Sequence, residues 1–277
     1  MANRILTGLR ALRSIVRQPT LLNHILAADE SAWQRRALAH TTRWPALSPT
    51  GLPVTPLAGL LPAAGDTVEP FAFGGGGSLP TDLLLLRALV RRAGPAARYF
   101  EIGTWRGESA AAVAPVAANV STLNLHPDQL RALGLSETYI AQHGHFSHHL
   151  PNVQHLLGDS AHYDYTGLGP FDVVFIDGDH RYAAVRTDTA RVFAHLVGPR
   201  TAVVWHDAAS QPGQPRWEVL AGLLDGLPAG APGHLYAVSH ALCALYVPEA
   251  LPAAPAEALP APGAGFRVTV VPLRGSD

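Results

Sequence analysis

Short apolar runs alternate with segments of helical periodicity through the middle of the chain, between residues 98 and 247. The apolar runs, each of strand length, are expected as strands at residues 98–102, 120–125, 153–157, 171–176, 201–205, 235–238 and 242–247. The helical segments that precede or separate them are expected at residues 83–90, 107–118, 128–142, 182–196 and 217–227. Such alternation is typical of an α/β fold, in which helices cover both faces of a mostly parallel sheet.

The residues before this region indicate a helical arm. Residues 3–17 and 20–40 show apolar positions at helical spacing and are separated by Pro19. Isolated helices of this length are marginal in water, so we expect the arm to pack against the rest of the chain or against a second copy in a homo-oligomer. No acidic residue precedes Asp29, and a basic interfacial helix or a transit peptide is the alternative interpretation.

Composition sets the boundaries between the parts of the chain. We divide it into a helical arm and linker at residues 1–75, an α/β domain at 76–250 and a Pro/Ala-rich tail at 251–277. The first helix of the domain is expected to be capped by Thr81 or Asp82. In the tail, the alternating polarity after Gly265 is typical of an edge strand over 266–271.

Charge and residue types exclude several classes of protein. The 277 residues include 20 basic and 21 acidic side chains, and we expect neither nucleic acid nor an anionic membrane as partner. All basic residues are arginine, which excludes a lysine Schiff base and the lysine of a P-loop. The single cysteine, Cys243, excludes an intrachain disulfide and fits the reducing cytoplasm. We see no signal peptide and no apolar run long enough for stable membrane insertion.

A glycine turn follows the first apolar run, with the sequence EIGTWRGES from Glu101 to Ser109. Gly103 lets the chain turn, and Gly107 lets the start of the next helix approach a ligand. The acidic residue before the first glycine and the wide glycine spacing differ from the G-x-G-x-x-G pattern of dinucleotide-binding enzymes. A strand-to-helix turn without a ligand would use the same glycines.

Polar residues also end or follow the next four apolar runs. They are Asn124, then Asp159 with Ser160, then Asp177 to His180, and finally His206 with Asp207. Ligands of parallel α/β sheets bind at the carboxyl ends of the strands, where all these residues are expected. Asn124 lies 21 residues after Gly103, the distance at which a ribose partner is expected, and Asp159 can accept a hydrogen bond from an adenine amino group.

The chain resembles the class I S-adenosylmethionine-dependent methyltransferases between about Gly75 and Val247. The resemblance rests on EIGTWRGES, on FIDGDHRY at residues 175–182, and on the segments GGSLPTD, STLNL, GDS, VVWHDA and LCALYV. It implies a Rossmann-like sheet of seven strands whose last strand is antiparallel, and S-adenosylmethionine as the cofactor.

The resemblance also implies which residues border the cofactor. They are Glu101, Gly103, Thr104, Trp105, Gly107, Ser109, Asn124, Asp159, Ser160 and Asp177. Among them, Glu101 and Gly103 would border the methionine and ribose, Asn124 would hold the ribose, and Asp159 with Ser160 would hold the adenine. The wider class has an acid at the position of Asn124, so this chain departs from the pattern there.

The residues after the fourth and fifth apolar runs are the candidates for catalysis. Asp177, His206 and Asp207 offer oxygen and imidazole ligands that suit Mg²⁺ or Mn²⁺, and such a metal would lower the pKa of an acceptor hydroxyl. By resemblance to sugar-modifying methyltransferases, His180 would take the acceptor proton, with Asp177 beside it. In the alternative, Asp177 touches only the cofactor and His206 forms hydrogen bonds within the sheet end.

The function that these features predict is O-methylation of a small-molecule hydroxyl. An N-methyltransferase, a nucleotide-binding enzyme such as a dehydrogenase, and a catalytically silent cofactor-binding or scaffold protein are the alternatives. A separate group of histidines, His143, His145, His148 and His149, precedes the third apolar run and is interpreted as a metal site, a substrate lid or a solvated loop.

Overall fold

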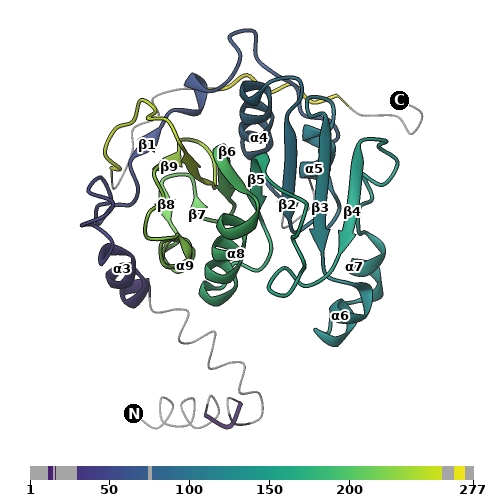
Figure 1. Cartoon of the computed structure of the whole chain (residues 1–277), viewed down its shortest axis with the longest axis horizontal. Helices are drawn as coiled ribbons and strands as arrows, with labels where there is room; N and C mark the ends of the chain where they lie inside the picture. The colour runs from purple at the N-terminus through teal and green to yellow at the C-terminus, as the bar shows by residue number, and fades with distance from the viewer. Residues whose placement is uncertain (1–11, 15, 17–29, 74–76, 258–264, 272–277) are drawn as a thin grey trace.

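An eight-stranded sheet forms the centre of the protein (Figure 1). The computed structural model describes residues 12–14, 16, 30–73, 77–257 and 265–271. The strand order is β1-β9-β10-β6-β5-β2-β3-β4. The strands are β1 (Val54–Thr55), β2 (Arg98–Ile102), β3 (Asn119–Asn124), β4 (Val153–Leu157), β5 (Phe171–Ile176), β6 (Val197–Trp205), β9 (His234–Val238) and β10 (Ala244–Val247).

One strand of this sheet, β10, runs antiparallel to both of its neighbours, whereas the other pairs are parallel. The predicted α/β class and the antiparallel last strand are therefore confirmed. The sheet has eight strands rather than the seven expected, because β1 adds to the edge beside β9. A strand of two residues is too short to show an alternation of polarity, so the sequence did not reveal β1.

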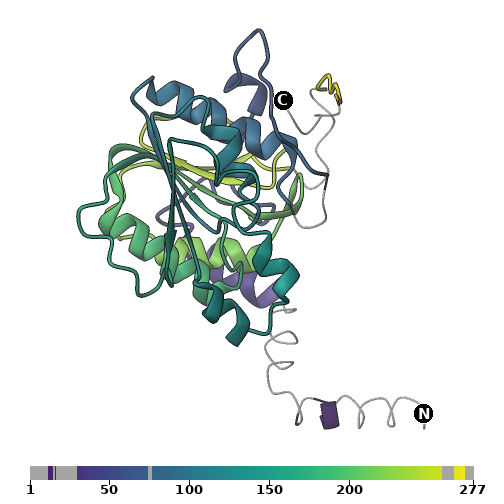
Figure 2. The same cartoon turned by 90° about the vertical axis from the view of Figure 1, so that its right-hand side faces the viewer.

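Helices cover both faces of the sheet (Figures 1 and 2). One face carries α4 (Pro80–Ala93) and α5 (Glu108–Val113), and the other carries α3 (Glu30–Leu38), α8 (Tyr182–His195) and α9 (Trp217–Gly226). Side chains alternate between the two cores along each strand: Val174 of β5 packs with the α8 and α9 side, whereas Phe175 packs with the α4 and α5 side. The central strands are thus buried on both faces, as their continuous apolar runs predict.

Most predicted elements are present, with boundaries that local breakers explain. β2, β4 and β5 have the predicted bounds, whereas the helix expected at 107–118 ends at Val113, shortly before Pro115. The helical region at 128–142 divides into α6 (Pro127–Ala132) and α7 (Glu137–Ala141), because Gly134 has a φ of 82°. A short turn, η1 (Leu57–Gly59), and a hairpin of β7 (Ala209–Gln211) and β8 (Gln214–Pro215) were not predicted.

Helix α4 begins three residues earlier than expected, at Pro80. Its first residue is a proline, whose missing N–H costs nothing in the first helical turn. Asp82 therefore occupies the third helical position and accepts a hydrogen bond from the backbone N–H of Leu79 at 2.7 Å. Asp82 still supports the helix start, although from inside the helix rather than from the cap position.

The segment before the sheet packs on the domain within the same chain. In α3, the ring of Trp33 stacks on Tyr182 of α8 with centroids 4.8 Å apart. The carboxylate of Asp225 in α9 accepts from Nε of Arg36 at 2.5 Å and lies 2.7 Å from Nε2 of His40. Of the helices expected in the arm, residues 12–14 and 16 and α3 are described as helical, and the remainder up to residue 29 lies outside the described residues.

The tail beyond β10 crosses the edge of the sheet. Val54 of β1 and Ala254 exchange two backbone hydrogen bonds, at 2.7 and 3.0 Å. The described residues 265–271, where an edge strand was expected, contain no strand. None of the helices in the described part of the chain is both long and apolar enough to cross a membrane.

Candidate active site

The polar residues predicted at five strand ends lie along one edge of the sheet. Backbone hydrogen bonds continue the strand pairing by one residue and fix this alignment. The donors and acceptors are Gly158 N–H to Asn124 O at 2.8 Å, Gly103 N–H to Leu123 O at 2.9 Å, Asp177 N–H to Ile102 O at 2.8 Å and His206 N–H to Ile176 O at 3.0 Å. The structure therefore brings the glycine turn and the catalytic candidates to a common edge, as the topology predicts.

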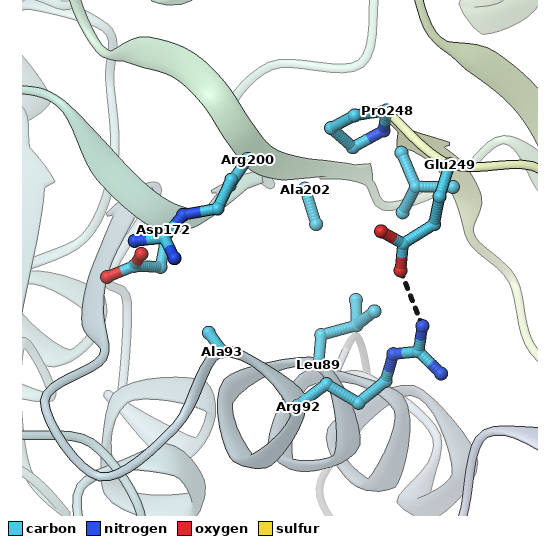
Figure 3. Close-up of a pocket in the computed structure, with 9 residues that line it drawn as sticks. Leu89, Arg92, Ala93, Asp172, Arg200, Ala202, Pro248 and Glu249 are labelled. Atoms are coloured by element: carbon cyan, nitrogen blue, oxygen red, sulfur yellow. Dashed lines mark hydrogen bonds and ion pairs between the residues drawn. The ribbon is translucent and has the colours of Figure 1, made fainter.

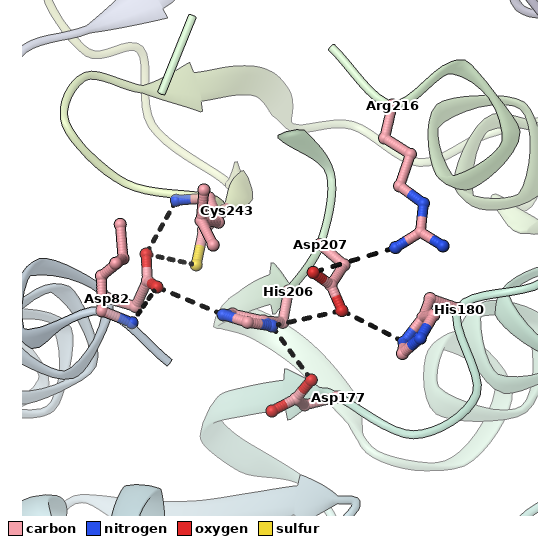
Figure 4. A network of polar contacts seen from close by, with 9 residues as sticks. Asp82, Asp177, His180, His206, Asp207, Arg216 and Cys243 are labelled. Carbon is pink, nitrogen blue, oxygen red and sulfur yellow. Dashed lines mark hydrogen bonds and ion pairs between the residues drawn. The ribbon is translucent and has the colours of Figure 1, made fainter. Parts of the chain in front are cut away.

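His206 lies at the centre of a polar network at the ends of β5 and β6 (Figure 4). Its imidazole is buried, and Nδ1 lies 3.1 Å from Oδ1 of Asp177 and 3.6 Å from Oδ2 of Asp207. On the other side of the ring, Nε2 lies 3.2 Å from Oδ2 of Asp82. One ligand atom from each of His206, Asp177 and Asp207 lies within 4.8 Å of the other two, so a single cation could bind between them.

Asp82 is a site residue to which the sequence analysis gave only a capping role. Its carboxylate is fully buried and also accepts from the backbone N–H of Leu242 at 2.8 Å and from Sγ of Cys243 at 3.5 Å. A hydrogen bond from Nε2–H of His206 to Asp82 would fix the orientation of the ring and leave a lone pair on Nδ1. Metal-ligating histidines commonly have such a carboxylate partner.

The network shifts the pKa values of its members. Burial lowers the pKa of His206, but the carboxylates of Asp177, Asp207 and Asp82 outweigh burial and raise it well above the usual value. Burial raises the pKa of Asp207, but the hydrogen bond and charge of His206, followed by His180 and Arg216, outweigh burial and lower it. Without a metal, the structure thus favours an imidazolium between carboxylates.

His180 stands at the outer side of this network, where its ring is half exposed. Its Nδ1 lies 3.1 Å from Oδ2 of Asp207. The other oxygen of this carboxylate, Oδ1, lies 3.8 Å from Nη1 of the Arg216 guanidinium. Asp207 itself has a φ of 55°, in the left-handed region that a residue other than glycine rarely adopts. A shallow depression in front of the network is lined by residues from the ends of β5 and β6 and from α8 and α9.

A glycine is required at position 103 because two strand ends approach each other closely there. Its φ is 97°, and a Cβ at this position would lie 2.0 Å from the backbone oxygen of Asp177. Gly107 has a φ of 78°, and a Cβ there would lie 2.1 Å from Oγ of Ser147. Both glycines therefore hold the turn against other parts of the chain, in addition to any contact with a ligand.

Glu101 is fully buried beneath the glycine turn. Its Oε2 accepts from the hydroxyl of Tyr99 at 2.8 Å, and Oε1 has no hydrogen-bond partner among the described residues. Burial raises the pKa of Glu101 to about 7, although the nearby hydroxyls of Ser109, Tyr99 and Thr122 act in the opposite direction. The side chain of Ser109 is thus directed at Glu101.

Two other predicted cofactor residues use their side chains within the protein. The buried hydroxyl of Thr104 is hydrogen-bonded to that of Thr122. Trp105, with a φ of 39°, stacks on Tyr139 with ring centroids 5.5 Å apart.

The predicted adenine and ribose residues lie at the ends of β3 and β4. Nδ2 of Asn124 donates only a long bond, 3.3 Å, to the carbonyl oxygen of Leu125. Asp159 accepts from the backbone N–H of Ala161 at 3.0 Å and lies 2.8 Å from Nδ1 of His162. With these local contacts, both side chains remain partly exposed at the edge.

A buried carboxylate from α8, Asp188, adds to this end of the site. Burial raises its pKa to about 6, and a hydrogen bond from Ser160 opposes the shift. Its Oδ2 would lie 3.5 Å from a Cβ added to Gly178. The sequence signal was available: Asp188 lies between Val185 and Val192 on the buried face of the helix, where a charged residue is unexpected.

A larger cavity lies elsewhere, between α4 and the sheet (Figure 3). It is lined by residues at the start of β5 and around the end of β10, including Asp172, Arg200 and Glu249. Asp172 is at the amino end of β5, whereas Asp177 follows the carboxyl end of the same strand. The cavity is therefore at the opposite end of the sheet from the predicted site residues.

Comparison with known proteins supports a methyltransferase. Residues 100–208 match a protein family described as a methyltransferase domain. A search of curated proteins found no match. Similar solved structures include CalS10, an amino pentose methyltransferase from Micromonospora echinaspora involved in calicheamicin biosynthesis. The two sequences are 22% identical, and the alignment covers 62% of this chain and 66% of CalS10 with a TM-score of 0.37. This chain thus spans about two thirds of the length of CalS10.

Two further structures show the same range of similarity. The O-methyltransferase from Bacillus cereus has 17% identity, with 63% of this chain and 84% of that chain covered and a TM-score of 0.44. The methyltransferase PaMTH1 from Podospora anserina has 15% identity, with 66% of this chain and 98% of that chain covered and a TM-score of 0.41. The family match spans the glycine turn and the ends of β5 and β6, so residues 100–208 are similar to a methyltransferase domain.

Proposed function

We propose that the protein transfers a methyl group from S-adenosylmethionine to a hydroxyl of a small molecule. The observation that carries this proposal is the pairing of His180 with Asp207 beside Asp177, at the edge where the glycine turn also ends. Methyl transfer to a hydroxyl requires an acceptor held in line with the sulfonium and a group that takes the proton. A base held by Asp207, with the cofactor at the glycine turn beside it, would meet both requirements.

The cofactor would lie along the strand ends from the glycine turn to Asp159. Gly103 provides the turn, the buried charge of Glu101 lies beneath it, and Asn124 and Asp159 are available to the ribose and adenine. Ser160 and Asp188 would support the adenine end from below. This placement leaves the methyl group near Asp177, where β2 and β5 are adjacent.

His180 would act as the general base. Its Nδ1 lies beside Oδ2 of Asp207, so the carboxylate can accept Nδ1–H and fix the tautomer in which Nε2 carries a lone pair. Nε2 would then take the acceptor proton, and Asp207 would stabilise the resulting imidazolium. The half-exposed position of the ring suits contact with a substrate that enters from solvent.

The same residues fit a divalent cation. Asp177 and Asp207 offer carboxylate oxygens and His206 offers Nδ1, while Asp82 holds the opposite side of the ring. This mixed donor set favours Mn²⁺ over Mg²⁺, which prefers oxygen ligands alone. A bound cation would supply Lewis acidity that lowers the pKa of an acceptor hydroxyl. In its absence, His206 as an imidazolium would place a positive charge at the same point.

The proposal is tested with the full chain and a panel of hydroxylated and aminated small molecules, by measuring release of S-adenosylhomocysteine. His180→Ala should keep the wild-type affinity for S-adenosylhomocysteine in calorimetry and lose about 10²–10⁴-fold in turnover. His234→Ala, an exposed histidine at the amino end of β9, is the matched control. Full activity of the His180 variant would exclude it as the base, and turnover of amines alone would indicate an N-methyltransferase.

The same assay tests for the metal. Activity that is lost with chelator and restored by Mn²⁺ would support a bound cation. Chelator-resistant activity that survives Asp207→Ala would contradict the metal site and leave a mechanism of positioning. Absence of any binding of S-adenosylhomocysteine would contradict the proposed function as a whole.

A further inference from the structure

A second group of metal-ligating side chains lies apart from the active-site edge. One nitrogen from each of His143, His148 and His155 lies within 4.8 Å of the other two. The ring centroids are 5.6 Å apart for His143 and His148, 5.5 Å for His143 and His155, and 4.3 Å for His148 and His155. His155 belongs to β4, three strands across the sheet from β5, so this group is separate from Asp177 and its neighbours.

Only two of the four histidines that are neighbours in the sequence belong to this group. His145 and His149 are exposed and do not belong to the group, whereas His155, from the following strand, does. A Cβ added to Gly144 would lie 2.8 Å from both Nε2 of His148 and Cε1 of His155. The φ of 65° at Gly144 therefore allows the loop to close over the two rings.

We propose that His143, His148 and His155 form a binding site for a zinc ion. Three neutral imidazoles are a common ligand set for Zn²⁺, with a fourth position left for water. Tetrahedral coordination at about 2.0–2.1 Å per bond needs the three nitrogens roughly 3.3 Å apart, so the rings must close in by only a small movement. The nitrogen donors suit zinc, unlike the mainly carboxylate donors around Asp177.

Unsatisfied ring nitrogens point to a ligand at this position. Both nitrogens of His143 and Nδ1 of His155 are buried and have no hydrogen-bond partner among the described residues. Buried polar atoms of native proteins nearly always have a partner, so these three atoms need one. Oγ of Ser147 lies 3.2 Å from Nε2 of His155 and can accept Nε2–H, which leaves the lone pair of Nδ1 free.

The surroundings favour neutral rings and a metal cation rather than ion pairs. Within the described part of the chain, none of the three histidines forms an ion pair with a carboxylate. Burial, followed by the neighbouring imidazoles, lowers the pKa of His143 to about 4. Burial also lowers the pKa of His155. No carboxylate is paired with these rings in the described chain, so their lone pairs are available to a metal.

A zinc ion here would fasten the loop that supports the glycine turn. The backbone N–H of Gly144 donates to the carbonyl oxygen of Trp105 at 2.7 Å, and that of Phe146 donates to Arg106 at 2.9 Å. Ser147, between the ligands, is the residue against which Gly107 packs. The ion would thus have a structural role, and the inference does not depend on which acceptor the enzyme methylates.

The test is a zinc titration of the untagged full chain by calorimetry. It is made with Asp207→Asn, which disables the separate carboxylate site. We expect one zinc ion per chain, and a dissociation constant raised about 100-fold or more by His143→Ala, His148→Ala or His155→Ala. His145→Ala and His149→Ala are the matched controls and should bind zinc as the parent protein does.

A melting experiment separates loss of the ion from loss of the fold. Zinc should raise the melting temperature of the parent and of His145→Ala, but not that of His148→Ala, which removes only an exposed ring. Absence of saturable zinc binding would overturn the proposal. An equal loss of binding in the two control variants would also overturn it, because it would show diffuse binding along the loop.

Discussion

Replacing Glu101 by glutamine is expected to remove a pH dependence of cofactor binding that the buried carboxylate creates. The pKa of Glu101 is about 7 because the side chain is fully buried. About one tenth of it is therefore ionised at pH 6 and about nine tenths at pH 8. The cofactor carries an ammonium group, which would bind the ionised form more tightly. The dissociation constant should then fall about tenfold from pH 6 to pH 8.

Calorimetry with S-adenosylhomocysteine measures this change directly. Glutamine nearly matches glutamate in shape, and its oxygen can still accept from the hydroxyl of Tyr99. Any titration of the ligand itself contributes equally to both proteins, so the comparison isolates Glu101. Binding should release about half a proton at pH 7 in the wild type and none from this group in the variant. An identical pH dependence in the two proteins would refute the reasoning.

The same carboxylate gives an expectation for stability without a cofactor. The folded pKa is raised from 4.5 to about 7, so the folded state holds the proton more tightly than the unfolded state between these values. The free energy of unfolding should therefore fall as pH rises from about 4.5 to about 7, by about 3 kcal/mol at most. Urea unfolding of Glu101→Gln should show a correspondingly flatter pH profile.

Three further changes test other parts of the structure. Gly103→Ala should lower the free energy of unfolding more than Gly134→Ala does, by at least about 2 kcal/mol. Both glycines have a positive φ, but only at Gly103 would the added Cβ clash with backbone atoms. Equal losses in urea unfolding would exclude the clash. Deletion of residues 1–40 should lower the melting temperature, because it removes the α3 contacts, and light scattering will show whether it also changes the oligomeric state. Asp82→Ala should cost more than about 2 kcal/mol in urea unfolding, because it leaves His206 and two backbone N–H groups without a buried acceptor; a smaller loss would mean that water replaces the carboxylate.

The central fold was predictable because its signals are local and strong. β2, β4 and β5 are continuous apolar runs bounded by polar or turn residues, so their bounds could be read directly. The edge that holds Gly103 and Asp177 followed from topology alone, since parallel strands end on the same side of a sheet. The eighth strand gave no such signal, because β1 has two residues and pairs through backbone groups only.

Contacts between distant segments were not predictable in the same way. Asp82 and His206 are 124 residues apart in sequence, and their contact requires the start of α4 to lie over the end of β6. The local pattern instead made Asp82 a capping residue, which is only part of its role. A buried acid at a helix start has the same sequence signature whether or not it also holds a histidine.

The two histidine groups show that residue type alone does not determine the charge of a histidine or the metal it can bind. His206 is surrounded by the carboxylates of Asp177, Asp207 and Asp82, so its ring is either a cation or one ligand beside oxygen donors. His143 is surrounded by other imidazoles, so its ring is neutral and its lone pairs are available to a softer metal. Both histidines are partly or fully buried, and the sequence cannot distinguish them until the neighbours are known. The identity of the charged groups within hydrogen-bonding distance therefore decides which metal each group can hold.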